Sequence, residues 1–219
     1  MTASVSLKKT IDHELSWREA ELAILKINLQ KSSTNMVEFR ISYRSFLAMT
    51  YAHYEGYTKR LLAQGLEDIH LSGVPIHKCV VGIHKTAALP EVRRKLNSMS
   101  SESLYEHLLK GILVFDEVNL PNPDAILDRG NLDIPTITWA MALIGVNFDN
   151  FVEHRQSIAR LTHLRHKCAH GEVITLDPLK TVPDILKDCY SLQDNIILFM
   201  HKLAVYLLDY FDQKQYVAN

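Results

Sequence analysis

Hydrophobic residues recur every three or four positions along most of this chain, and this helical period constrains its fold more than any other feature. The first such stretch covers residues 10–31. A second helix is predicted to begin at a cap formed by Thr34 or Asn35, because short polar side chains accept the free amides of a first helical turn. We expect this helix to end at Gln64, since Gly65 resembles the glycine that follows many helix ends.

Further helical stretches continue to the end of the chain. The next helix is predicted over residues 76–88 and 91–96 with an interruption between them, and another over 100–115. Thr136 can cap a helix over 136–145, and Gly171 is predicted to stop a helix over 149–169. The last predicted helix covers 181–213, with Pro183 in its first turn. A loop rich in Pro, Asn, Asp and Gly covers residues 116–135. Because each amphipathic stripe must bury itself against another, the sequence predicts an all-α bundle of six to seven helices forming a single domain over residues 1–219.

Charge and cysteine content exclude several classes of protein. The net charge is −1, so the chain lacks a broadly basic surface and any RNA binding must come from a local cleft. The three Cys residues are widely spaced and form no CxxC, which argues against a disulfide framework or a thiolate zinc site. Glycine-rich phosphate loops, HExxH and GxSxG are absent. No stretch of 18 apolar residues occurs, so we expect a cytoplasmic protein without a membrane span.

One segment concentrates cationic side chains at the end of the helix predicted over 149–169. His163, Arg165, His166, Lys167 and His170 fall within eight positions. A guanidinium that binds phosphate oxygens and an imidazole that transfers protons suffice for RNA cleavage, because the ribose 2′-OH supplies the nucleophile. On a regular helix, His166 and His170 share a face, whereas Arg165 and His170 are about 140° apart.

Three other interpretations of this segment remain open. The cations could simply complement the dipole at a helix C-terminus. His163, His166 and His170 could bind a metal with Glu172, although three ligands strung along about 10 Å of one helix seldom converge on one ion. Cys168 could form a dyad with a neighbouring His, but a Cys beside Ala within a helix is more often a small buried residue.

Two segments resemble a known family. Residues 165–171 (RHKCAHG) resemble the signature of the HEPN superfamily, in which Arg, a polar residue, a few further residues and His stand near the end of a helix. Residues 51–57 (YAHYEGY) are similar to the Tyr-rich stretch followed by Glu-Gly in the MAE-like and RiboL-PSP-associated HEPN branch. As an all-helical plan the resemblance covers most of the chain, but the motifs match only in these two segments.

The resemblance implies a metal-independent endoribonuclease that leaves a 2′,3′-cyclic phosphate and a 5′-OH, needs no cofactor and acts as a homodimer with the two motifs facing one cleft. Arg165 would stabilise the phosphorane, His170 would act as general base or acid, and His166 would orient the substrate or the other His. Lys167 would add to the RNA-binding charge. Many bacterial members are toxins or phage-defence effectors with a partner protein such as an antitoxin.

One departure from the family and one alternative accompany this interpretation. Toxins paired with a nucleotidyltransferase antitoxin often carry Tyr two residues after the motif His, where this chain has Glu172. Other members have lost catalysis, so a non-catalytic helical module for RNA binding, protein binding or dimerisation is the alternative.

Glu55 is a further candidate site residue. It borders the apolar stripe of the second predicted helix, and a half-buried carboxylate requires a cationic partner. We expect Glu55 to contact or position Arg165 and His170; otherwise it faces water or caps a neighbouring helix.

Overall fold

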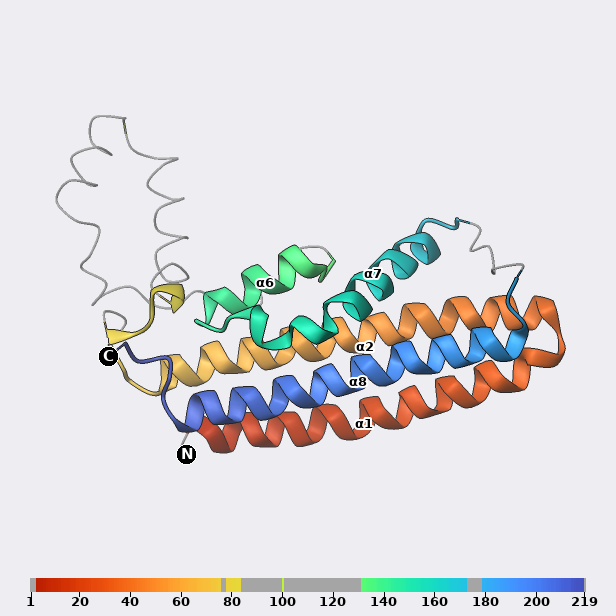
Figure 1. Ribbon diagram of the computed structural model, residues 1–219. Coiled ribbons are helices and arrows are strands. Elements are labelled where there is room, and N and C mark those ends of the chain that lie inside the picture. The colour runs from red at the N-terminus through yellow and green to blue at the C-terminus, as the bar shows by residue number, and fades with distance from the viewer. Residues whose placement is uncertain (1–2, 76–77, 84–99, 101–130, 173–178, 219) are drawn as a thin grey trace.

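Three long helices lie side by side in the computed structural model, and two shorter helices pack along them (Figure 1). The long helices are α1 (Ala3–Lys31), α2 (Met36–Leu71) and α8 (Val182–Asp212), and the shorter ones are α6 (Ile134–Leu143) and α7 (Arg155–Ala169). The structure describes residues 3–75, 78–83, 100, 131–172 and 179–218. The fold is all-α, as predicted, and no strand occurs in this described part.

The connection between α1 and α2 follows the predicted capping chemistry. A short 3-10 helix, η1 (Ser32–Thr34), ends α1, and the Asn35 side chain then accepts the amides of Val37 and Glu38. Asn35 is therefore the N-cap of α2, which confirms the second of the two predicted caps.

The predicted end of α2 at Gln64 is wrong. The helix continues through Gly65 to Leu71, and the glycine with a positive φ (68°) is Gly73. Gly65 instead allows close packing against α8, because a Cβ at this position would lie 2.8 Å from the ring of Phe211. The sequence signal was ambiguous because a glycine that ends a helix and one that admits a neighbouring helix look alike.

The helix predicted to begin after Thr136 begins earlier. Asp133 is the N-cap of α6 and accepts the Thr136 amide at 2.9 Å, while Pro135 occupies the first turn. The predicted loop 116–135 therefore ends two residues too late, and its part up to 130 lies outside the described residues.

Only residues 78–83 of the predicted helix 76–96 are described, and Cys79 there forms an antiparallel bridge with Val217 rather than a helical turn. The predicted helix 100–115 lies outside the described residues apart from residue 100.

The segment predicted as one helix over 149–169 has two parts. A 3-10 helix, η4 (Phe148–His154), precedes α7, and Phe151 interrupts the helical backbone with a φ of −127°. Helix α8 matches its prediction closely: Thr181 and Asp184 form a reciprocal capping box, and Pro183 lies in the first turn.

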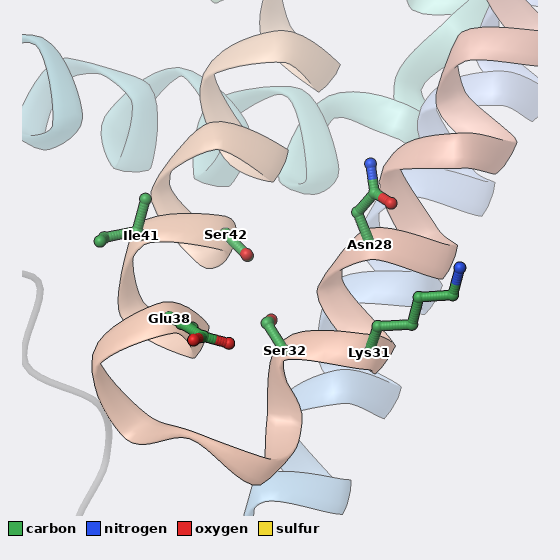
Figure 2. A pocket seen from close by; sticks show the side chains of 6 residues that line it. All are labelled: Asn28, Lys31, Ser32, Glu38, Ile41 and Ser42. Atoms are coloured by element: carbon green, nitrogen blue, oxygen red, sulfur yellow. The ribbon is translucent and has the colours of Figure 1, made fainter.

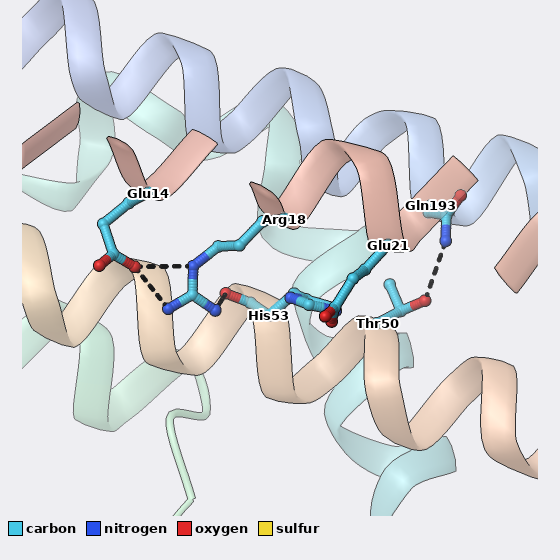
Figure 3. A network of polar contacts seen from close by, with 6 residues as sticks. All are labelled: Glu14, Arg18, Glu21, Thr50, His53 and Gln193. Atoms are coloured by element: carbon cyan, nitrogen blue, oxygen red, sulfur yellow. Dashed lines mark hydrogen bonds and ion pairs between the residues drawn. The ribbon is translucent and has the colours of Figure 1, made fainter. Parts of the chain in front are cut away.

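A buried polar network links α1 with α2 (Figure 3). The Arg18 side chain is 10% exposed, forms an ion pair with Glu14 at 2.7 Å and donates to the His53 carbonyl at 3.4 Å. Gly56 makes room for it, because a Cβ there would lie 3.2 Å from the guanidinium nitrogens. Nε2 of His53 lies 3.2 Å from the Glu21 carboxylate, and burial together with Arg18 lowers the His53 pKa. The network fixes the relative position of the two helices.

The same polar layer reaches α8, where Gln193 donates to the Thr50 hydroxyl of α2 at 3.3 Å. Both side chains are buried, so a shift of α8 along α2 would leave two polar groups without a partner.

Asp68, near the end of α2, gives a pH-dependent prediction for stability. Its side chain is buried, Oδ1 accepts from Gln64 at 3.1 Å, and Oδ2 has no hydrogen-bond partner. Burial raises its pKa from 3.8 to about 6. The folded state therefore holds this proton more tightly than the unfolded state, and stability is lost as pH rises from about 4 to about 6. We expect Asp68→Asn to raise the free energy of unfolding at pH 7.5 by about 1–3 kcal/mol, with little difference at pH 4.

Urea denaturation of both proteins at the two pH values measures this effect. Asp12→Asn on the exposed surface of α1 is the matched control and should leave the free energy of unfolding unchanged at both pH values. An equal gain for Asp68→Asn at pH 4 and pH 7.5 would show that ionisation is not the cause.

Candidate functional site

The cationic segment, residues 163–170, covers the last two turns of α7 and its C-cap, and the helix ends as predicted. The amide of Glu172 donates to the Lys167 carbonyl at 3.0 Å, and the amide of Gly171 donates to the Cys168 carbonyl at 3.3 Å. Gly171 has a φ of 68°, which completes a Schellman motif with His170 as the C-cap. The motif residues therefore stand at a helix C-terminus, where the dipole favours positive charge.

Arg165 is half-buried and held from two sides. Its Nη1 donates to Oδ1 of Asn131 at 2.6 Å, and its Cζ lies 5.0 Å from the centroid of the Tyr51 ring on α2. A cation over an aromatic face is attracted by the negative charge density of the ring. The guanidinium therefore has a defined place between α2 and the segment that precedes α6.

Tyr51 and Tyr54 anchor that segment to α2. The Leu132 amide donates to the Tyr51 hydroxyl at 2.6 Å, and the Tyr54 hydroxyl donates to the Leu132 carbonyl at 3.1 Å. Burial, with the nearby Glu55 carboxylate, raises the pKa of Tyr51 to about 12, so its phenol stays neutral at physiological pH. The Tyr-rich stretch of α2 thus contributes a polar framework to the site as well as core packing.

His166 and His170 form an exposed imidazole pair. Their ring centroids lie 4.2 Å apart with planes tilted by 51°, as their four-residue spacing predicts. Both side chains face solvent, so their nitrogens are accessible to a ligand.

Arg165 and His170 do not meet within one chain. The helix stays regular to its end, since the His170 amide still donates to the His166 carbonyl at 3.1 Å. Five residues of regular helix turn the two side chains about 140° apart. The guanidinium accordingly lies against Tyr51 and Asn131, while the imidazole pair lies on the solvent face. One chain presents two separate halves of the predicted site.

Lys167 and Cys168 stand between the two paired imidazoles of the segment. Lys167 is half-buried, and its carbonyl takes part in the Schellman motif. Sγ of Cys168 donates to the Arg44 carbonyl at 3.8 Å, and burial raises the pKa of this thiol. A protonated, half-buried thiol is a poor nucleophile, which argues against the Cys168–His dyad.

The metal interpretation finds no support in the geometry. Within the residues that the structure describes, no three His, Cys, Asp or Glu side chains are arranged to hold an ion. His166 and His170 lie side by side, but His163 does not complete a group of three with them.

Arg44 of α2 is a site residue that the sequence did not indicate. Its Nη1 donates to the Glu172 carbonyl at 2.9 Å and its Nη2 to the Cys168 carbonyl at 3.0 Å. It therefore adds a second donor to the Cys168 carbonyl in the last turn of α7, binds the Glu172 carbonyl just beyond the helix, and so holds the turn that carries His170. No local signal marked Arg44, because its partners lie about 124 residues further along the chain.

Glu55 lies one turn beyond Tyr51 on α2 and forms an ion pair with Lys59 at 2.9 Å. Its side chain is 20% exposed, which agrees with the expected half-burial. The cation it contacts is thus a neighbour on its own helix rather than Arg165 or His170, and its influence on the site is through the pKa of Tyr51.

Comparison with known proteins gives one match. The family model described as HEPN_MAE_28990-like HEPN matches residues 7–216 and so includes every element of the site. No curated protein and no solved structure matches the chain. No helix in the described part of the chain is long and apolar enough to cross a membrane.

Proposed function

Because this chain belongs to the HEPN_MAE_28990-like HEPN family, we propose that it is a metal-independent endoribonuclease. Membership of the family points to an RNA-related function. The observation that carries the proposal is the exposed His166–His170 pair at the capped end of α7, one turn from the anchored guanidinium of Arg165.

The chemistry requires only these groups and the RNA. The His170 imidazole takes the proton of the ribose 2′-OH, and the 2′ oxygen attacks the adjacent phosphorus. Arg165 stabilises the negative charge of the phosphorane. The bond to the 5′ oxygen then breaks, and a protonated imidazole returns a proton to the leaving oxygen. The products are a 2′,3′-cyclic phosphate and a 5′-OH. His166 orients the substrate or the His170 ring, and Lys167 adds positive charge beside the phosphate.

Two copies of the chain are needed for this reaction. Arg165 and His170 diverge by about 140° along one helix, so one chain does not direct both at the same phosphodiester. A two-fold dimer that opposes the two α7 ends would place Arg165 of one protomer across from His170 of its partner. Pooling the cations of two copies also gives a local basic cleft on a protein whose net charge is only −1.

Mixing two inactive variants tests this shared site. Dimers formed from equal amounts of Arg165→Ala and His170→Ala protein should regain about a quarter of wild-type activity, since about half are mixed and each mixed dimer has one intact site of two. The variants are unfolded together and refolded so that protomers exchange. An inactive mixture would contradict the sharing of Arg165 and His170 between protomers.

Cleavage of single-stranded RNA in EDTA tests the reaction itself. We expect full activity, products with 2′,3′-cyclic phosphate and 5′-OH ends, and no cleavage of the same sequence as DNA, which lacks the nucleophile. Loss of activity in EDTA would favour a metal mechanism instead.

We also propose a biological setting. A cytoplasmic endoribonuclease without a cofactor requires control, and a toxin or phage-defence effector silenced or activated by a partner protein provides it. Glu172 occupies the position where antitoxin-modified relatives carry Tyr, so control by modification at that position is not part of this proposal.

A non-catalytic assembly module is the second candidate, and the outer face of α1 and α2 favours it. Large apolar side chains of these helices are exposed, among them Ile24 (54%) and Ile41 (61%), and such side chains mark an interaction site where they are contiguous. A groove of about 300 Å³ lies between the helices beside Ile24 and Met49. A second, polar hollow of about 320 Å³ lies at the α1–α2 turn, where Ser32, Glu38 and Ser42 line it (Figure 2).

A further inference from the structure

The Arg165 guanidinium is the one motif group that the protein holds in place. Nη1 donates to Asn131 at 2.6 Å, and Cζ lies over the Tyr51 ring, 5.0 Å from its centroid. A guanidinium has five N–H donors, so the bond to Asn131 leaves donors for a phosphate. An arginine side chain that is free in solvent loses much rotational freedom when it binds a phosphate, whereas Arg165 is already held in place before a phosphate arrives.

Asn131 itself is rigidly placed. The next residue, Leu132, is fully buried, and both of its backbone polar groups are bonded to tyrosine hydroxyls of α2. Two residues after Asn131, the backbone amide of Asp133 donates to the Asn131 carbonyl at 3.0 Å, and the Asp133 side chain caps α6. The backbone that carries the Asn131 side chain is thus fixed to α2 and to α6 at once.

The chemical type of this partner matters. An aspartate at position 131 would form an ion pair with Arg165 and cancel much of the charge that a phosphate needs. The neutral amide of Asn131 accepts the same hydrogen bond without cancelling the charge. The pair therefore combines a fixed guanidinium with an undiminished positive charge.

We propose that Asn131 is a positioning residue that orients Arg165 toward the scissile phosphate, with Tyr51 as the supporting surface. This role rests on the proposed endoribonuclease function. Asn131 touches no substrate atom in this assignment: it acts through Arg165, and its contribution is to have the phosphate-binding donors aligned before RNA arrives.

Two substitutions at position 131 separate orientation from charge. Asn131→Ala frees the guanidinium, so we expect kcat to fall about 10–100-fold with less than a threefold change in KM. Asn131→Asp keeps the hydrogen bond but offsets the charge of Arg165. We therefore expect weaker RNA binding. The logarithm of the RNA association constant should also fall less steeply with the logarithm of the salt concentration, by about one unit of slope.

Binding is measured in a His170→Ala background, which keeps the RNA intact. Asn28→Asp is the matched control: it makes the same change of charge at an exposed position of α1 outside the proposed site, so the dependence of RNA binding on salt should not change. A purely structural role for Asn131 would lower Tm in both variants and leave the salt slope unchanged, and that result overturns the proposal.

The outcomes also separate this role from the proposed function. If the wild type cleaves RNA and Asn131→Ala cleaves it with the same kcat, the positioning role alone is wrong. If the wild type neither cleaves nor binds RNA, the endoribonuclease proposal fails and the role of Asn131 falls with it.

Discussion

Replacing His170 by Ala is expected to lower kcat for RNA cleavage by about 10²–10⁴-fold, the usual contribution of a positioned acid–base group. His170 is exposed at the C-cap of α7 and does not support the core, so the variant should fold with an unchanged Tm. Single-turnover cleavage of a labelled RNA by the purified protein measures the effect, and circular dichroism verifies the fold.

His163→Ala is the matched control for this experiment. His163 is an exposed imidazole on the same helix, two turns before His170, and it has no role in the proposed reaction. The His163→Ala protein should cleave RNA at the wild-type rate. If His163→Ala and His170→Ala lost activity together, the metal interpretation would replace the acid–base mechanism. If His170→Ala retained full activity, His170 would not be the proton carrier.

Phe199→Ala is expected to lower the free energy of unfolding by about 3–5 kcal/mol. Phe199 of α8 is fully buried, and its ring lies 5.7 Å from each of the rings of Tyr54, Phe151 and His154. It therefore joins α8 to α2 and to the 3-10 helix that leads into α7. Removing it leaves a cavity at the point where these elements meet.

Urea denaturation measures this loss, and the neighbouring Leu198→Ala is the control. Leu198 lies on the same helix but is 59% exposed, so its replacement should change stability by no more than about 0.5 kcal/mol. Similar losses for the two variants would mean that α8 packs on α2 through a different face.

The sequence predicted the long helices and several of their ends, but it placed the cap of α6 three residues late and missed the break at Phe151. It also failed where a residue served a distant partner. The Asn35 cap, the stop at Gly171 and the place of Pro183 in the first turn of α8 depend on contacts within a few residues, which sequence spacing reveals. Gly65 resembles a helix end in the sequence because the approach of Phe211 from α8 leaves no mark in the local sequence.

The candidate site divides in the same way. The four-residue spacing of His166 and His170 predicted their shared face, because the helix alone brings them together. The partners of Arg165 and the capping role of Arg44 were not predicted, since Asn131 is 34 positions from Arg165 and the partners of Arg44 lie far along the chain.

The order of residues by itself determined that this chain is helical, where several helices begin and end, and which imidazoles share a face, because the α-helical period and backbone capping are local. Only the tertiary structure decided that Arg165 turns toward Tyr51 and Asn131 while His170 turns toward solvent. That choice depends on which face of α7 packs on α2, and such packing is settled by burial across the whole bundle.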